Sequence, residues 1–118
     1  MRRVLERHGE HFMNKVLTPD EQHFCQARRD TGLALAGRFA VKEAAIKAIG
    51  TPQGARWRDF EVIPATLNSP PNLQLHGAVA AHAQKRGIES LNVSITHDAG
   101  IAAAVVIAEG IVPIKKDS

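Results

Sequence analysis

Four charged side chains lie close together between residues 36 and 47, in the stretch Ala-Gly-Arg-Phe-Ala-Val-Lys-Glu-Ala-Ala-Ile-Lys. Residues three or four apart share a face of a helix, so Lys47 lies one turn beyond Glu43, and Arg38 and Lys42 form an adjacent basic row. A carboxylate binds hard cations such as Mg²⁺, and Arg and Lys side chains bind phosphate oxygens. The grouping therefore predicts a site for a divalent metal and phosphate groups.

A purely structural role for the same residues has to be weighed against this site. Glu43 and Lys47 have the spacing of an ion pair that stabilises an exposed helix by only about 0.2–0.5 kcal/mol and is very common. Spacing alone favours that interpretation over a metal site.

Two further side chains could take part in chemistry. His97 ends an alternating stretch, residues 91–97, where its imidazole could bind phosphate or act as a base. The alternative is a half-buried histidine that hydrogen-bonds to the turn through Asp98. Cys25 has no cationic neighbours close in sequence and occupies an apolar helical position, so we expect it to pack in the core rather than act as a nucleophile.

The sequence pattern predicts helices first and then mostly strands. Thr18, Pro19 and Glu21 form the start signal of a helix, with Glu21 three residues after the capping Thr18. Residues 51–54 are expected to form a loop, and Asp98, Ala99 and Gly100 predict a tight hairpin turn before the last strand. That strand is apolar throughout, so we expect it to be buried on both faces. The predicted helices are 2–17, 19–28, 33–49 and 77–86, and the predicted strands are 57–63, 73–75, 91–97 and 101–108. This order indicates the α+β class, with helices followed by an antiparallel sheet.

Length and composition predict one domain. Of the 118 residues, 44% are hydrophobic and only 4% aromatic, so the core is expected to consist of Ala, Val, Ile and Leu. Assembly with other copies would help so modest a core. We expect the domain to span residues 1–109, with 110–118 as a flexible tail.

The charge balance suits an anionic partner. The formal charge is +3 and the sequence pI is about 9.4, which fits an acidic protein, a nucleotide or a nucleic acid. A nucleic-acid binder rests on this balance alone, because the sequence shows neither an aromatic stacking platform nor a recognised motif. With one cysteine, no apolar run of about 20 residues and no signal-peptide pattern, the sequence predicts a cytoplasmic protein that binds neither membrane nor nucleic acid.

Six stretches together resemble the holo-acyl-carrier-protein synthases, the small 4′-phosphopantetheinyl transferases. They occur in the family's order and lie at residues 5–9, 17–22, 36–44, 57–62, 75–77 and 93–97. The resemblance implies a phosphopantetheinyl transferase-like α+β protomer, a homotrimer with active sites in clefts between protomers, and Mg²⁺ as cofactor. It also implies transfer of 4′-phosphopantetheine from coenzyme A to a serine of apo acyl carrier protein, releasing adenosine 3′,5′-bisphosphate.

The resemblance also assigns roles to individual residues. Glu43 matches the family's Mg²⁺-binding Glu and Lys47 its pyrophosphate-binding Lys, and these two are the expected catalytic residues. Arg38, Thr96 and His97 match positions that line the coenzyme A pocket.

The N-terminal part matches the family in one respect and departs from it in another. The basic first helix, with Arg2, Arg3 and Arg7, matches the surface that receives the acidic carrier protein. Family members begin with an apolar strand and a Gly-Thr-Asp segment whose Asp is the second metal ligand, whereas this sequence starts inside the following helix. We therefore expect either a truncated reading of the gene or half a metal site. The alternative function is an impaired form that binds coenzyme A or carrier protein without turnover.

Overall fold

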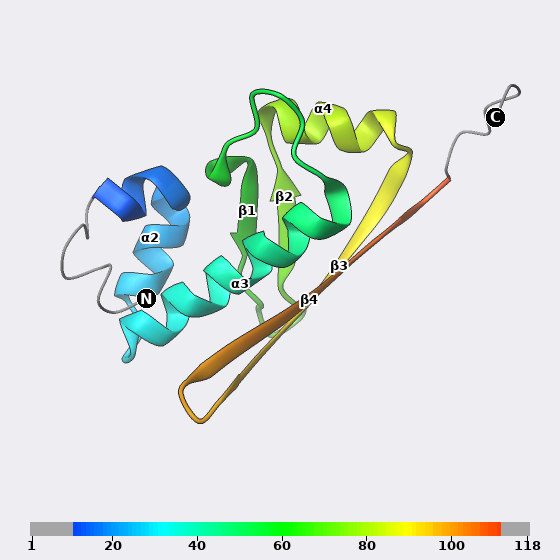
Figure 1. Ribbon diagram of the computed structural model, residues 1–118. Helices are drawn as coiled ribbons and strands as arrows, with labels where there is room; N and C mark the ends of the chain where they lie inside the picture. Colours follow the sequence, from blue (N-terminus) through cyan, green and yellow to red (C-terminus); the bar gives the residue numbers. More distant parts are fainter. Residues whose placement is uncertain (1–10, 112–118) are drawn as a thin grey trace, which may run out of the picture.

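A short helix and α2 (Pro19–Gln26) open the part of the chain that the computed structural model describes, residues 11–111 (Figure 1). Residues 11–16 are helical, and Thr18 then caps α2. The Thr18 hydroxyl accepts from the Glu21 amide at 3.2 Å, and the Glu21 carboxylate accepts from the Thr18 amide at 2.9 Å. This confirms the predicted capping box, although α2 ends two residues earlier than the sequence pattern indicated.

The long helix α3 (Thr31–Ile49) lies between the remaining elements. Asp30 caps its first turn by accepting from the Leu33 amide at 3.0 Å, and Gly50 ends it with a positive φ of 99°. Glycine adopts this conformation without steric cost. The predicted helix is confirmed, and it begins two residues before Leu33.

A 3-10 turn, η1 (Trp57–Asp59), precedes strand β1 (Phe60–Ile63), which pairs antiparallel with β2 (Asn72–Leu75). The sequence pattern predicted a strand from Trp57 onward, and this was wrong for three residues. The buried Asp59 carboxylate accepts from the Arg56 amide at 3.1 Å and from the Arg56 guanidinium at 3.0 Å, which curls this segment back on itself.

The last three elements are α4 (Gly77–Lys85), β3 (Ile88–Asp98) and β4 (Ile101–Gly110). The two strands form a long antiparallel hairpin that crosses α3 (Figure 1). Its turn consists of Ala99 and Gly100, both with positive φ, as a two-residue hairpin turn of the primed type requires. The predicted hairpin is confirmed, and β4 extends to Gly110, the first residue assigned to the tail.

The hydrophobic core lies on either side of α3. One cluster includes Val41, Ile49, Phe60 and Val79, from α3, β1 and α4. A smaller cluster packs α2 and the preceding turn against the first half of α3 and contains the wholly buried Cys25. Its complete burial confirms core packing as the role of Cys25, and burial also raises the pKa of the thiol.

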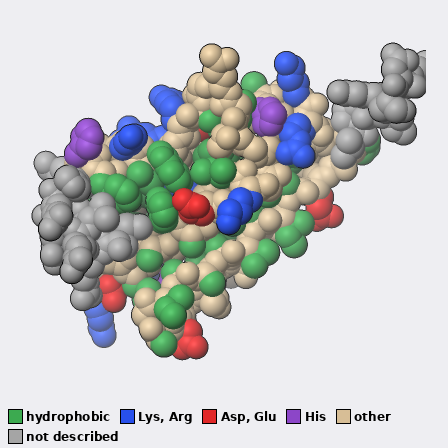
Figure 2. All heavy atoms as spheres, in the orientation of Figure 1, with side chains coloured by type: hydrophobic (Ala, Val, Ile, Leu, Met, Phe, Trp, Pro, Cys, Tyr) green, Lys and Arg blue, Asp and Glu red, His purple; other side chains and the backbone are tan. Residues whose placement is uncertain are grey.

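Strand β4 is covered on one face only, so the prediction that both faces are buried was wrong. Ile101, Val105 and Ile107 point outward and are 68%, 58% and 52% exposed. The alternate residues face α3, and no other described element covers the outer face. Figure 2 shows hydrophobic side chains on the surface along the hairpin. Among the described helices, none has the length and apolar character needed to cross a membrane.

Candidate active site

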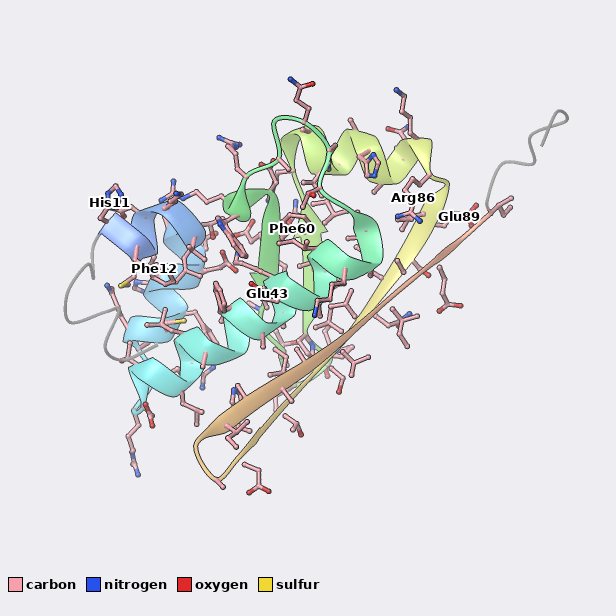
Figure 3. All side chains as sticks on the ribbon, viewed as in Figure 1. His11, Phe12, Glu43, Phe60, Arg86 and Glu89 are labelled. Atoms are coloured by element: carbon pink, nitrogen blue, oxygen red, sulfur yellow. The ribbon has the colours of Figure 1, made fainter. Side chains whose placement is uncertain are left out.

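Glu43 and Lys47 both lie on the exposed side of α3, one turn apart (Figure 3 labels Glu43). The ion pairs between described residues are Lys42–Glu21, Arg56–Asp59 and His76–Glu61, so the predicted structural pair between Glu43 and Lys47 does not form. Neither side chain forms a hydrogen bond or an ion pair with another residue in the described part of the protein. The carboxylate and the ammonium are therefore both open to a ligand.

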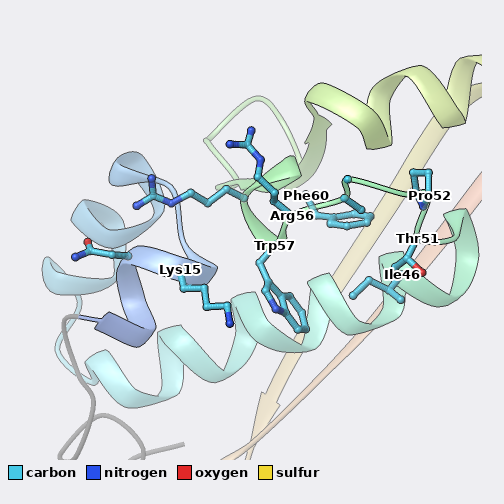
Figure 4. Close-up of a pocket in the computed structure, with 11 residues that line it drawn as sticks. Lys15, Ile46, Thr51, Pro52, Arg56, Trp57 and Phe60 are labelled. Carbon is cyan, nitrogen blue, oxygen red and sulfur yellow. The ribbon is translucent and has the colours of Figure 1, made fainter.

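A pocket of about 630 Å³ lies beside this face of α3, and we call it the Trp57 pocket. Its apolar walls come from three separate segments and include Ile46, Pro52, Trp57 and Phe60. Figure 4 shows the Trp57 indole pointing toward α3. Cationic side chains also line the pocket, namely those of Lys15, Arg56 and Arg58. Such a combination suits an anionic ligand with an apolar arm.

Sequence reasoning missed this pocket, although it noted the loop at residues 51–54. Lys15, Ile46 and Trp57 are far apart in the chain, and only the fold brings them together. The available signal was the lone tryptophan directly after a cationic residue in a sequence poor in aromatics.

Lys42 does not belong to the predicted phosphate-binding row. Its side chain is wholly buried, and its ammonium donates to Glu21 Oε1 at 2.9 Å and to the backbone carbonyls of Trp57 and Phe60. Burial lowers the pKa of Lys42, and the Glu21 carboxylate partly offsets this effect. A lysine whose three N–H bonds are all used inside the protein is not available to bind phosphate.

Arg38 is also turned inward, but it keeps an unmet donor. Its guanidinium lies 3.8 Å from the centre of the Phe24 ring, and only 5% of the residue is exposed. Its buried Nε has no hydrogen-bond partner among the described residues. Burial lowers the pKa of the Arg38 guanidinium. A buried, unsatisfied N–H costs about 1–3 kcal/mol, so an added oxygen acceptor would be favourable here.

His97 packs against the first half of α3. A Cβ placed on Gly37 would lie 2.8 Å from His97 Nε2, so only glycine admits the ring at this distance. The alternative bond from His97 to Asp98 is absent within the described residues, and both His97 and its neighbour Thr96 are exposed. The imidazole is therefore accessible beside the α3 residue that precedes Arg38.

The predicted site residues fall into two groups rather than one. Glu43 lies five residues beyond Arg38, which corresponds to about 7.5 Å along the helix axis and about 140° around it. Arg38 lies in the first half of α3 and His97 of β3 packs against that half, whereas Glu43 and Lys47 belong to the face beside the Trp57 pocket. One copy of the chain does not bring the two groups together.

The described residues provide Glu43 as a single accessible carboxylate for a metal at this face. They contain no group of three or more metal-ligating side chains. Asp20 and Asp30 lie in the first turn of α2 and at the N-cap of α3. One carboxylate still fits Mg²⁺, because this ion usually combines one or two protein carboxylates with substrate phosphates and water.

Comparison with known protein families identifies the family of the chain. Residues 1–106 match ACPS, the 4′-phosphopantetheinyl transferase superfamily. The chain belongs to this superfamily. The resemblance seen in the six sequence stretches is thereby confirmed.

Curated relatives and solved structures agree with this assignment. The chain is 44% identical over 105 residues to a protein of Anaeromyxobacter sp. (strain K) named holo-[acyl-carrier-protein] synthase, covering 89% of this chain and 80% of the relative. A Helicobacter pylori holo-[acyl-carrier-protein] synthase in complex with coenzyme A matches with a TM-score of 0.75 and 29% identity, over 92% and 90% of the two chains. The Chronobacterium ammoniagenes ACPS–CoA complex matches with a TM-score of 0.78 and 32% identity, over 93% and 88%.

The individual role assignments of the phosphopantetheinyl transferase site remain predictions. The comparisons give the superfamily and the fold, and they do not assign Glu43, Lys47, Arg38, Thr96 or His97. The predicted docking residues, Arg2, Arg3 and Arg7, lie outside the described residues.

Proposed function

We propose that the protein is a holo-acyl-carrier-protein synthase. It transfers the 4′-phosphopantetheine group of coenzyme A to a serine of apo acyl carrier protein and releases adenosine 3′,5′-bisphosphate. The observation that carries the proposal is the open Glu43 and Lys47 pair beside the Trp57 pocket, in a chain 44% identical to a holo-[acyl-carrier-protein] synthase.

The Trp57 pocket is the proposed site of the pantetheine arm. Its apolar walls bury the arm, and the cations of Lys15 and Arg56 attract the phosphates. Lys47 is open on the adjacent face of α3, where its ammonium meets the diphosphate. Arg38 of a neighbouring copy would offer its unmet Nε to a further ligand oxygen.

The reaction breaks the diphosphate of coenzyme A. The carrier serine oxygen attacks the β-phosphorus, and the bond from that phosphorus to the bridging oxygen breaks, so adenosine 3′,5′-bisphosphate leaves. Lys47 offsets the negative charge that develops on the leaving phosphate. The Glu43 carboxylate would receive the proton of the serine hydroxyl. A bound Mg²⁺ would neutralise diphosphate charge, and Glu43 would be the ligand that this part of the chain supplies.

We also propose that three copies assemble with sites between them. The outward row of β4, Ile101, Val105 and Ile107, supports assembly because it is an apolar surface that a single copy leaves in water. The separation of Arg38 and His97 from Glu43 supports sites made by two neighbouring copies, one giving each group. The protein would work in the cytoplasm, where a lone thiol such as Cys25 stays reduced.

Docking of the carrier protein is proposed to use Arg2, Arg3 and Arg7. The support is the basic character of the first helix in the sequence, which complements an acidic partner. Lys15, at the described end of the same region, lines the Trp57 pocket and so lies close to where the carrier serine must arrive.

Mass spectrometry of a carrier protein tests the proposed function directly. The protein is mixed with apo carrier protein, coenzyme A and Mg²⁺, and we expect the carrier to gain one phosphopantetheine. A parallel sample with EDTA should show no gain. Absence of transfer at high enzyme concentration would contradict the proposal, and calorimetry with coenzyme A then separates an inert protein from one that binds without turnover.

A further inference from the structure

The buried Lys42 has no role in the proposed chemistry, yet it hydrogen-bonds to the backbone of two residues that line the Trp57 pocket. Its ammonium has three donors, and all three are occupied, by Glu21 Oε1 at 2.9 Å, by the Trp57 carbonyl at 3.1 Å and by the Phe60 carbonyl. The side chain has no exposed surface. Lys42 therefore joins the middle of α3 to the backbone of η1 and β1.

Glu21 holds the ammonium in this position. Its Oε1 also accepts from the Thr18 amide at 2.9 Å, and its Oε2 accepts from the Val62 amide at 2.9 Å. The carboxylate is thus fixed by the start of α2 on one side and by β1 on the other. A carboxylate with its hydrogen bonds satisfied in this way defines where a buried cation must lie.

The two carbonyls that Lys42 binds belong to residues that line the Trp57 pocket. Trp57 of η1 and Phe60 of β1 line the pocket, and Ile46, one turn beyond Lys42 on α3, lines the same pocket. Lys42 is also the residue directly before Glu43. One side chain therefore sets the distance between the pocket wall and the helix that presents the open carboxylate.

We propose that Lys42 is a positioning residue for coenzyme A, fixing the wall formed by residues 57–60 against α3. The inference rests on the proposed function only for the identity of the ligand. Loss of these hydrogen bonds leaves the wall free to move, so the ligand must order it on binding. Substrate binding weakens in the ground state and the transition state alike, which raises KM and leaves kcat nearly unchanged.

A paired variant, compared with two single variants, separates positioning from mere stability. Lys42→Met alone leaves the Glu21 charge buried without its partner, so the paired variant Glu21→Gln/Lys42→Met removes both charges and keeps a residue that a capping box accepts. Glu21→Gln alone is an intermediate variant, because Lys42 keeps its two carbonyl acceptors but loses the carboxylate that holds its ammonium. Val79→Ala, a cavity in α4 outside the Trp57 pocket, controls for lost stability.

The measurements are steady-state kinetics and quenching of the single tryptophan by acrylamide. In the paired variant we expect the KM for coenzyme A to rise about tenfold, kcat to change less than about twofold, and the Trp57 quenching constant to rise about twofold. Val79→Ala should keep wild-type values of both KM and quenching, and Glu21→Gln should give values between those of the wild type and those of the paired variant.

Wild-type KM or wild-type quenching in a folded Glu21→Gln/Lys42→Met variant would overturn the proposal. The quenching comparison needs neither coenzyme A nor turnover. If the wild-type protein neither binds coenzyme A nor transfers its arm, the proposed function fails, and quenching alone decides whether Lys42 fixes the wall.

Discussion

Two adjacent residues of α3, Lys42 and Glu43, differ in environment as much as two neighbours can. Lys42 is wholly buried and makes three hydrogen bonds, one of them in an ion pair. Glu43 is exposed and has no ion-pair partner among the described residues. The two side chains point about 100° apart around the helix, which is enough to separate the protein interior from solvent.

The difference between Lys42 and Glu43 shows that a charged side chain in this helix is not functional merely because it is charged. The buried cation is already satisfied by the fold, whereas the exposed carboxylate and Lys47 are unsatisfied and open to a ligand. Substitutions on the buried side should therefore change stability and, through the pocket wall, the KM for coenzyme A, whereas substitutions on the open side should change activity and leave stability unchanged. The predictions that follow set one side against the other.

Lys42→Met should cause the largest change in stability. Removing one partner of a buried pair costs about 3–5 kcal/mol, because the remaining Glu21 carboxylate stays buried without its cation. Urea unfolding followed by circular dichroism measures the loss. The Glu21→Gln/Lys42→Met variant should recover most of it, and a loss below about 1 kcal/mol in the single variant would show that the pair contributes little.

Glu43→Gln should lower kcat/KM for transfer about 100-fold, which corresponds to about 2.7 kcal/mol of transition-state stabilisation. The free energy of unfolding should stay within about 0.5 kcal/mol of wild type, since the side chain is on the surface. Glu89→Gln, an exposed carboxylate on β3, is the matched control and should keep full activity. Equal activity of the two variants would remove Glu43 from the site.

The pH dependence of stability tests Cys25 on the buried side. Burial raises its pKa above the model-compound value of 9.0. Above pH 9.0 the unfolded thiol loses its proton while the folded thiol keeps it, so wild-type stability should fall relative to Cys25→Ala by up to about 1.4 kcal/mol per pH unit. Below pH 9.0 the difference in the free energy of unfolding between the wild type and Cys25→Ala should be constant. Urea titrations at several pH values measure it, and a constant difference up to pH about 10.5 would contradict the raised pKa.

The smallest effect concerns the open pair itself. Because no ion pair joins Glu43 and Lys47, a double-mutant cycle with alanine at both positions should give a coupling energy below about 0.2 kcal/mol. A coupling of about 0.3–0.5 kcal/mol that fades with added salt would instead show an ordinary helical ion pair.

Local signals in the sequence were enough to predict the helices and the hairpin. The capping box at Thr18 and Glu21 involves residues three apart, and the Asp98–Gly100 turn is set by neighbouring residues. Their interactions do not depend on the rest of the fold. The η1 turn was missed because it depends on Arg56 and Asp59 closing on each other, where alternation alone indicated a strand.

The environment of α3 could not be predicted in the same way. The helix is rich in Ala and Gly and has small or apolar residues on every side, so spacing does not identify its buried face. Lys42 therefore seemed to share a basic row with Arg38, although its partners Glu21 and Phe60 come from other elements. Similarly, β4 is apolar on both faces, and only the position of α3 determines which one is covered.

The outward row of β4 has a consequence for the protein at different concentrations. The apolar side chains of this row, Ile101, Val105 and Ile107, stabilise the protein only when another surface removes them from water. If neighbouring copies provide that surface, folding and association are linked by mass action. The melting temperature should then rise with protein concentration, and the most dilute solutions should contain the least stable form of the enzyme.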